Sequence, residues 1–151
     1  MNDEFDRADE RDKPEAAAIR LRCGSIFQKV TDDTYEVSVT LEHDGCEYIG
    51  FAATKNTDEQ RRVCIATATL SAVHAFLGLE KAPFRLMSVK KITSTPVPIC
   101  MVLMEHVEGN DSTVLVGAAE LVGEEMVSVQ RASMDAINRK IAGLYAEARG
   151  Q

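Results

Sequence analysis

Residues 37–43, VSVTLEH, return in altered form as CMVLMEH at residues 100–106. The same offset of 63 aligns LRCGSIFQKV (21–30) with FRLMSVKKIT (84–93). Farther along, YIGFAA (48–53) aligns with LVGAAE (115–120), and ATLSAVHAFLG (68–78) aligns with ASMDAINRKIAG (132–143). The offset changes where loops are expected to differ in length. The chain is therefore predicted to contain two copies of a unit of roughly sixty residues.

Each copy has the pattern of three strands followed by a helix. Around residues 34–42, apolar and polar residues alternate, which is typical of a strand with one buried face. Asp44-Gly45 then predicts a two-residue turn into a strand with the sequence CEYIGFAA. Thr57 and Gln60 predict a capping box, in which the Thr57 hydroxyl accepts from the Gln60 amide and the Gln60 side chain reaches back.

The two predicted helices each carry one apolar stripe at helical spacing. The first helix ends near Gly78, and its stripe is Val63, Ala66, Leu70, Val73 and Leu77. The second runs from about residue 124 to residue 148, and its stripe is Val127, Met134, Ile137, Ile141 and Leu144. We expect an α+β fold, in which two tandem βββα repeats form an antiparallel six-stranded sheet with two helices on one face.

Residues 18–151 are expected to form a single domain made of two repeats, at about 20–79 and 83–148. An acidic flexible arm is expected at residues 1–17, because residues 1–15 hold seven acidic and three basic side chains. Much of the net charge of -7 therefore belongs to the arm. The remaining body has no long basic run, so neither nucleic acid nor an anionic membrane is expected as a main partner.

The four cysteines, Cys23, Cys46, Cys64 and Cys100, include no Cys-x-x-Cys pair. Thiols scattered in this way are typical of small buried side chains in a reducing compartment. The sequence shows neither a signal peptide nor a membrane span. We therefore expect a cytoplasmic protein without a cofactor.

The repeated Glu-His pair is a candidate site, because histidine binds metals and titrates near neutral pH. Neighbouring residues of a strand point to opposite faces, however, so Glu42 and His43 cannot close on one ion, and neither can Glu105 and His106. We therefore expect that His43 and His106 have structural roles and do not form a site. A small enzyme or metal-binding protein that uses His43 and His106 is the alternative. His74 is expected at a solvated or edge position of the first helix.

The two middle strands differ on the face that turns away from the helices. In the first copy this face carries Glu36, Ser38, Thr40 and Glu42. In the second copy it carries Ile99, Met101, Leu103 and Glu105. An apolar side chain left in water forgoes about 1.5 to 3 kcal/mol, so the second face should be covered.

Ile99, Met101 and Leu103 are therefore predicted to form an interface, with Val102 and Met104 on the opposite, core side. The simplest cover is a second copy of the chain across a twofold axis. The alternative cover is EAAAIRL (15–21) of the same chain.

The first copy, from YEVSV through GFAATKNTDEQRRVCIATATLSAVHAFL, resembles part of a double-stranded RNA-binding domain. The resemblance implies phosphate contacts at the start of the helix, where Lys55, Arg61 and Arg62 stand beside Asp58 and Glu59. The basic Lys-Lys-x-Ala-Lys run of that family is missing. The equivalent stretch of the second copy, VGEEMV, would repel phosphate.

The doubled plan is also similar in outline to the dimeric, leucine-sensing regulatory domain of 2-isopropylmalate synthase, but the Gly-Pro-rich stretch of that family is absent and no ligand residue carries across. VGAAEL followed by VQRASMDAINRKI resembles a group of uncharacterised small bacterial proteins that are doubled in the same way. This resemblance supports the fold and implies no activity.

The sequence thus predicts a non-catalytic homodimeric module for interaction with a protein partner or for sensing a small molecule. The alternatives are the histidine-based enzyme or metal protein and, last, an RNA-binding protein.

Overall fold

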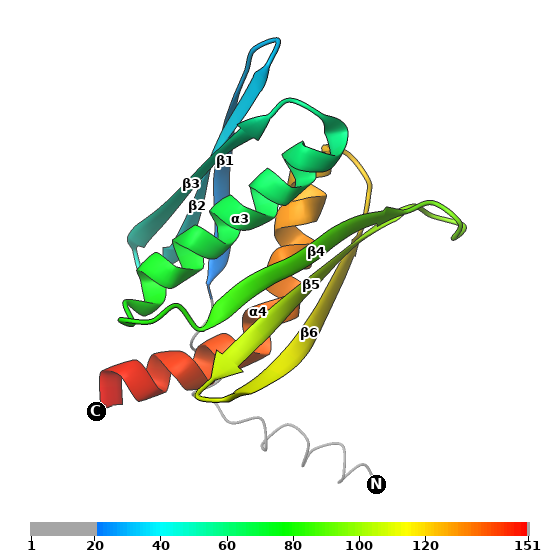
Figure 1. The fold of residues 1–151 in the computed structure, drawn as a ribbon. Coiled ribbons are helices and arrows are strands. Elements are labelled where there is room, and N and C mark those ends of the chain that lie inside the picture. The colour runs from blue at the N-terminus through cyan, green and yellow to red at the C-terminus, as the bar shows by residue number, and fades with distance from the viewer. Residues whose placement is uncertain (1–20, 151) are drawn as a thin grey trace, which may run out of the picture.

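The computed structural model describes residues 21–150, and it describes side chains up to residue 148. Its elements in chain order are β1 (Arg22–Val30), β2 (Thr34–His43), β3 (Cys46–Lys55), α3 (Asp58–Leu77), β4 (Phe84–Ile92), β5 (Ile99–Glu108), β6 (Asp111–Glu120) and α4 (Glu125–Gly150) (Figure 1). The α+β class and the repeated βββα order are confirmed. The predicted arm at residues 1–17 lies outside the described residues, as does nearly all of the segment 15–21.

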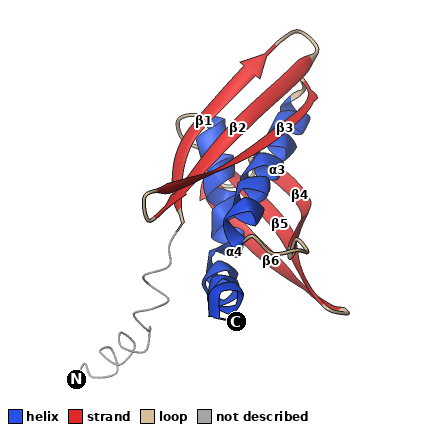
Figure 2. Cartoon of the chain, turned by 90° about the vertical axis from the view of Figure 1, so that its left-hand side faces the viewer, coloured by secondary structure: helices blue, strands red, loops and turns tan. Residues whose placement is uncertain are grey.

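The strands form two antiparallel three-stranded sheets, with the orders β1-β2-β3 and β4-β5-β6. This corrects the expectation of one six-stranded sheet with both helices on one face. α3 packs on β2 and β3, and α4 packs on β5 and β6, while each helix also contacts the other helix and the first strand of the other sheet. The helix pair therefore lies between the two sheets (Figure 2).

The burial of α3 explains why the second sheet folds over the helices. The predicted stripe of α3 is buried except for Val63, which is partly buried, but Ile65, Ala68, Ala72 and Phe76 on other sides of the helix are buried as well. A single sheet covers only one side of a helix and would leave these side chains in water. Exposed positions remain along one narrow line through Thr67, Ser71 and Ala75.

The duplication is visible in three dimensions. Both first strands have an irregular register near their start, between Cys23 and Ile26 in β1 and between Leu86 and Ser88 in β4. Thr69 and Ser133 occupy equivalent helix positions at an offset of 64, and both donate their hydroxyl to the carbonyl four residues earlier, at 2.8 Å. The two copies therefore share this side-chain contact as well as their order of strands and helix.

Local signals place the ends of several elements correctly. Asp44 and Gly45 have φ values of 55° and 82°, which suit the predicted tight turn between β2 and β3. Gly78 ends α3 in the left-handed conformation, and its amide donates to the His74 carbonyl. Neither helix of the described part of the chain is long and apolar enough to cross a membrane.

Candidate functional site

The predicted interface residues lie on the outer face of the second sheet, which points away from the helices. Val102 and Met104 are fully buried on the inner side of β5, and strand alternation turns the neighbouring Ile99, Met101 and Leu103 outward. On β6, Val114 and Val116 face outward beside Glu105 and Leu103. We call Ile99, Met101, Leu103, Val114 and Val116 the β5 face.

The β5 face is apolar across two strands and open to solvent. Val114 is 51% exposed and Val116 is 57% exposed, whereas the β5 residues between β4 and β6 are partly buried by their neighbours. Within residues 21–150, the elements that pack on the second sheet lie on its inner side (Figure 2). The sheet thus presents a contiguous apolar surface of the kind that marks an interaction site.

The charges at one end of the β5 face neutralise each other. The Arg85 guanidinium forms an ion pair with the Glu105 carboxylate on the neighbouring strand. Hydrogen bonds from Ser112 and then from Arg85 lower the pKa of Glu105. Because its charge is already compensated within the sheet, Glu105 is no strong obstacle to covering the adjacent apolar side chains.

The outer face of the first sheet is less polar than its middle strand indicates. Strand alternation turns Ser38 and Thr40 of β2 outward, as predicted, although Thr40 is buried there. Phe27 of β1 and Phe51 of β3, however, lie in one row on either side of Ser38, and both rings are largely exposed, as is Ile49 beside Thr40. The contrast between the two sheets is therefore smaller than the middle strands alone predicted, because edge strands also contribute to a face.

The two histidines of the repeated Glu-His pair lie among aromatic side chains. The His43 ring packs edge-on against Phe76 and Tyr145, with ring centroids 5.1 and 5.4 Å apart. His106 is buried beside Phe84 at 5.4 Å. Among the residues that the structure describes, no three His, Cys, Asp or Glu side chains gather in a way that could hold a metal ion.

His74 is half-buried, not solvated, and its ring stacks on Phe84 at 6.1 Å. Burial lowers the pKa of His74, because the charged imidazolium is poorly solvated there. The ring thus joins α3 to β4 as a packing group.

The basic side chains at the start of α3 are engaged within the chain. Arg61 donates to the Asn56 side chain at 2.6 Å and pairs with Asp58, while Arg62 pairs with Glu125 at 3.1 Å. Lys55 is exposed at the end of β3. Carboxylates therefore compensate both arginines that the resemblance to RNA-binding domains would assign to phosphate.

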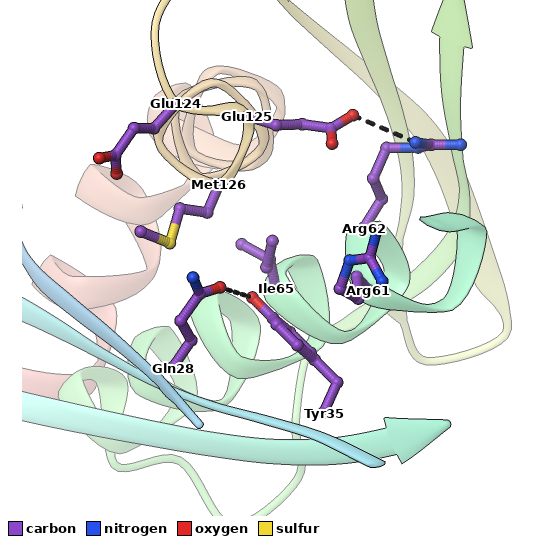
Figure 3. Close-up of a pocket in the computed structure, with 8 residues that line it drawn as sticks. All are labelled: Gln28, Tyr35, Arg61, Arg62, Ile65, Glu124, Glu125 and Met126. Atoms are coloured by element: carbon purple, nitrogen blue, oxygen red, sulfur yellow. Dashed lines mark hydrogen bonds and ion pairs between the residues drawn. The ribbon is translucent and has the colours of Figure 1, made fainter. Parts of the chain in front are cut away.

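A cavity of about 270 Å³ lies where the first turns of α3 and α4 meet the inner side of β1 and β2 (Figure 3). It is lined by Gln28, Tyr35, Arg61, Arg62, Ile65, Glu124, Glu125 and Met126. The Tyr35 hydroxyl donates to Gln28 Oε1 at 2.7 Å. Burial raises the pKa of Tyr35 to about 12, so the phenol stays protonated at neutral pH and acts as a donor.

A second cavity of about 380 Å³ lies next to the first, between β1 and α4. It is lined by Cys23, Gly24, Ile26, Glu124, Met126, Val127, Gln130 and Arg131. Glu124 and Met126 line both cavities, so the two spaces adjoin along the start of α4. We call the two cavities together the β1–α4 cleft.

The residues of this cleft were not singled out from the sequence, apart from the two arginines considered for RNA. One signal was present for Gln130. It is four residues before Met134 and three after Val127, so it interrupts the apolar stripe of α4 with a polar side chain.

The chain was compared with protein-family models and with curated proteins. No protein-family model matches the chain, and no curated protein matches its sequence.

Proposed function

We propose that this protein is a non-catalytic binding module that associates with a second copy of itself through the β5 face. The proposal is carried by one observation, the contiguous apolar surface on the outer side of the second sheet, where Val114 and Val116 are more than half exposed. Monomeric proteins seldom leave such a surface uncovered.

The size of the face favours a weak dimer. The whole outer side of the second sheet, with β4 included, has three strands about 4.8 Å apart and about 30 Å long. It presents roughly 430 Å² of flat area, so two copies would bury roughly 900 Å² or somewhat more. Stable specific interfaces bury roughly 1,200 to 2,000 Å² in total. We therefore expect a dissociation constant on the order of micromolar or weaker, with the oligomeric state depending on concentration.

A twofold axis suits this face because two sheets that pack face to face keep their strands nearly aligned. Met101 and Leu103 lie on the middle strand, so in a symmetric pair they would contact the same residues of the second copy. Both side chains are partly buried in one copy and would become fully buried in the dimer. Burying the remaining exposed surface of each would contribute about 1 kcal/mol or more to the free energy of association.

The test is the solution mass of a variant that carries both Met101→Glu and Leu103→Glu. The wild-type mass should rise towards that of two chains as the protein concentration increases, whereas the variant should keep the mass of one chain. Light scattering after size exclusion measures the mass. Circular dichroism should show unchanged helix, because both side chains lie on the outer side of β5.

The matched control is Ser38→Glu, since Ser38 occupies the position of Met101 in the first copy. It should leave self-association unchanged. If Ser38→Glu abolishes association while the double variant retains it, the interface lies on the first sheet and the proposal is wrong.

A reducing, cytoplasmic location is part of the proposal. It is supported by four free cysteines, of which Cys64 and Cys100 are buried as expected, whereas Cys23 and Cys46 are exposed. Burial raises the pKa of Cys100 to about 11, which keeps the thiol protonated and unreactive as a packing group.

A further inference from the structure

Two buried hydrogen-bond donors without partners lie on residues that line the β1–α4 cleft. Within the described residues, only three buried side-chain nitrogen or oxygen atoms have no hydrogen-bond partner: Arg62 Nε, Gln130 Nε2 and His74 Nε2. Arg62 lines the first cavity and Gln130 lines the second. Gln130 is only 2% exposed, and a buried amide without an acceptor destabilises a fold by about 1–3 kcal/mol.

The duplicated scaffold does not require these polar groups. At the offset of 64 that relates the two helices, Gln130 corresponds to Ala66 and Arg62 corresponds to Met126. Ala66 is fully buried in α3, so an alanine satisfies the packing at this helix position. Each copy thus carries one polar donor where its twin carries an apolar side chain, and both donors belong to the same cleft.

Apolar side chains line part of the space between the donors, beside the polar and charged ones. Ile65 and Met126 line the first cavity, and Ile26, Met126 and Val127 line the second. In Figure 3, the Met126 side chain extends from the start of α4 towards Gln28, on the opposite side of the cavity from Arg62. Each cavity is close in size to the lower range of ligand sites, which is roughly 300 Å³.

The charges narrow the class of molecule that fits. Arg62 is positively charged and pairs with Glu125 through Nη1, which leaves its Nε–H for another acceptor. A carboxylate is the natural acceptor for a guanidinium. Glu124 and Glu125 line the same cavity and repel any anion, so a singly charged carboxylate fits better than a phosphate, which carries up to two charges.

We propose that the β1–α4 cleft binds a small organic carboxylate with an apolar body, whose carboxylate accepts from Arg62 Nε while the body passes over Met126 towards Gln130. A polar oxygen at the far end of the body accepts from the Gln130 amide. The site gives the proposed binding module a ligand, but no residue of the β5 face lines it and it does not depend on the dimer.

The experiment is a titration of ¹⁵N-labelled protein with probes of the proposed class: butyrate, hexanoate and 6-hydroxyhexanoate. The side-chain N–H signals of Arg62 and Gln130 are followed by magnetic resonance. The Arg62 signal should shift with every probe, and hexanoate should bind more tightly than butyrate, by about fourfold for each added methylene. The Gln130 signal should shift most with 6-hydroxyhexanoate, which carries a terminal oxygen.

Two variants test the residues, and each introduces the side chain that the twin copy already carries. Arg62→Met should weaken hexanoate binding at least tenfold, and Gln130→Ala should remove the advantage of 6-hydroxyhexanoate over hexanoate. Gln130→Ala is expected to fold, because Ala66 occupies the equivalent position of α3. The control is Arg139→Met, a change at an exposed position of α4 outside the cleft, which should bind as the wild type does.

Failure of this inference and failure of the dimer proposal are distinguishable. The titration is repeated on the variant that carries Met101→Glu and Leu103→Glu, where binding should persist. The inference is overturned if the Arg62 signal does not respond to the probes. It is also overturned if Arg62→Met binds hexanoate as tightly as Arg139→Met does.

Discussion

At the scale of single residues, the closest contacts between helix and sheet depend on two glycines. A Cβ atom on Gly50 would lie 2.5 Å from the amide nitrogen of Ala72 and closer still to the Ala68 carbonyl. A Cβ atom on Gly117 would meet the Ala132 carbonyl and would lie 2.9 Å from the Ala136 Cα. These glycines let each helix lie directly on its own sheet.

Gly117→Ala is expected to destabilise the protein by about 3 kcal/mol or more, because the atoms that the new methyl group would meet belong to the backbone of α4 and cannot rotate away. Gly143→Ala is the matched control. Gly143 lies in the same helix with no atom within 4 Å of an added Cβ, so this change should stabilise by about 0.5–1 kcal/mol. Urea unfolding measures both, and equal effects of the two substitutions would contradict the close packing.

The sequence predicted which residues of β5 point outward, because strict alternation determines the face of each residue. It also aligned Gly50 with Gly117, but it did not show what either glycine contacts. A glycine in a strand is compatible with a bulge, a bend or a close approach, and only the neighbouring backbone distinguishes these. For the same reason the cleft around Gln130 could not be predicted, since its walls come from β1 and α4, which are about a hundred residues apart.

At the scale of elements, the start of α3 shows how far local signals reach. The Thr57 side chain accepts from the Gln60 amide at 3.2 Å, as the capping box predicted. The second half of the box is wrong, because Gln60 Oε1 instead accepts from the Thr54 hydroxyl at 3.1 Å. Thr54 belongs to β3, so a contact with the preceding strand replaces the contact within the helix end.

Thr57→Ala should destabilise the protein by about 1 kcal/mol, since it removes the acceptor for one amide of the first turn. Thr67→Ala, at an exposed position of the same helix, should be neutral or slightly stabilising because alanine has the higher helix propensity. Thermal unfolding compares the two. A loss of stability with Thr67→Ala equal to that with Thr57→Ala would show that the capping contact is not responsible.

The strands and helices were predicted nearly at their observed positions, whereas the number of sheets was not. The spacing of apolar residues along the sequence indicates whether one side of an element is buried. In α3 this spacing predicted a single apolar stripe. Two of the additional buried side chains of α3, Ala68 and Ala72, are small and give a weak periodic signal, while the large Ile65 and Phe76 lie off the predicted stripe. The second burial surface of the helix, and with it the separate second sheet, was therefore missed.

At the scale of the whole molecule, each repeat depends on the other to complete its core. α3 is covered by its own sheet, by α4 and by β4, and α4 is covered by its own sheet, by α3 and by β1. Arg62 of the first repeat pairs with Glu125 of the second at the meeting point of the helices. Neither repeat can therefore unfold without exposing the apolar helix of the other, so the two should unfold together.

Hydrogen exchange under native conditions tests this dependence with Thr57→Ala, a change confined to the first repeat. If the repeats form one cooperative unit, the most protected amides of α4 and β5 should exchange about fivefold faster, the same factor as those of α3, because all report the same global opening. Faster exchange restricted to β1, β2, β3 and α3 would contradict this and would make each repeat an independent unit. The first repeat would then unfold while the second stays folded, and the cleft between β1 and α4 would open whenever the first repeat unfolds.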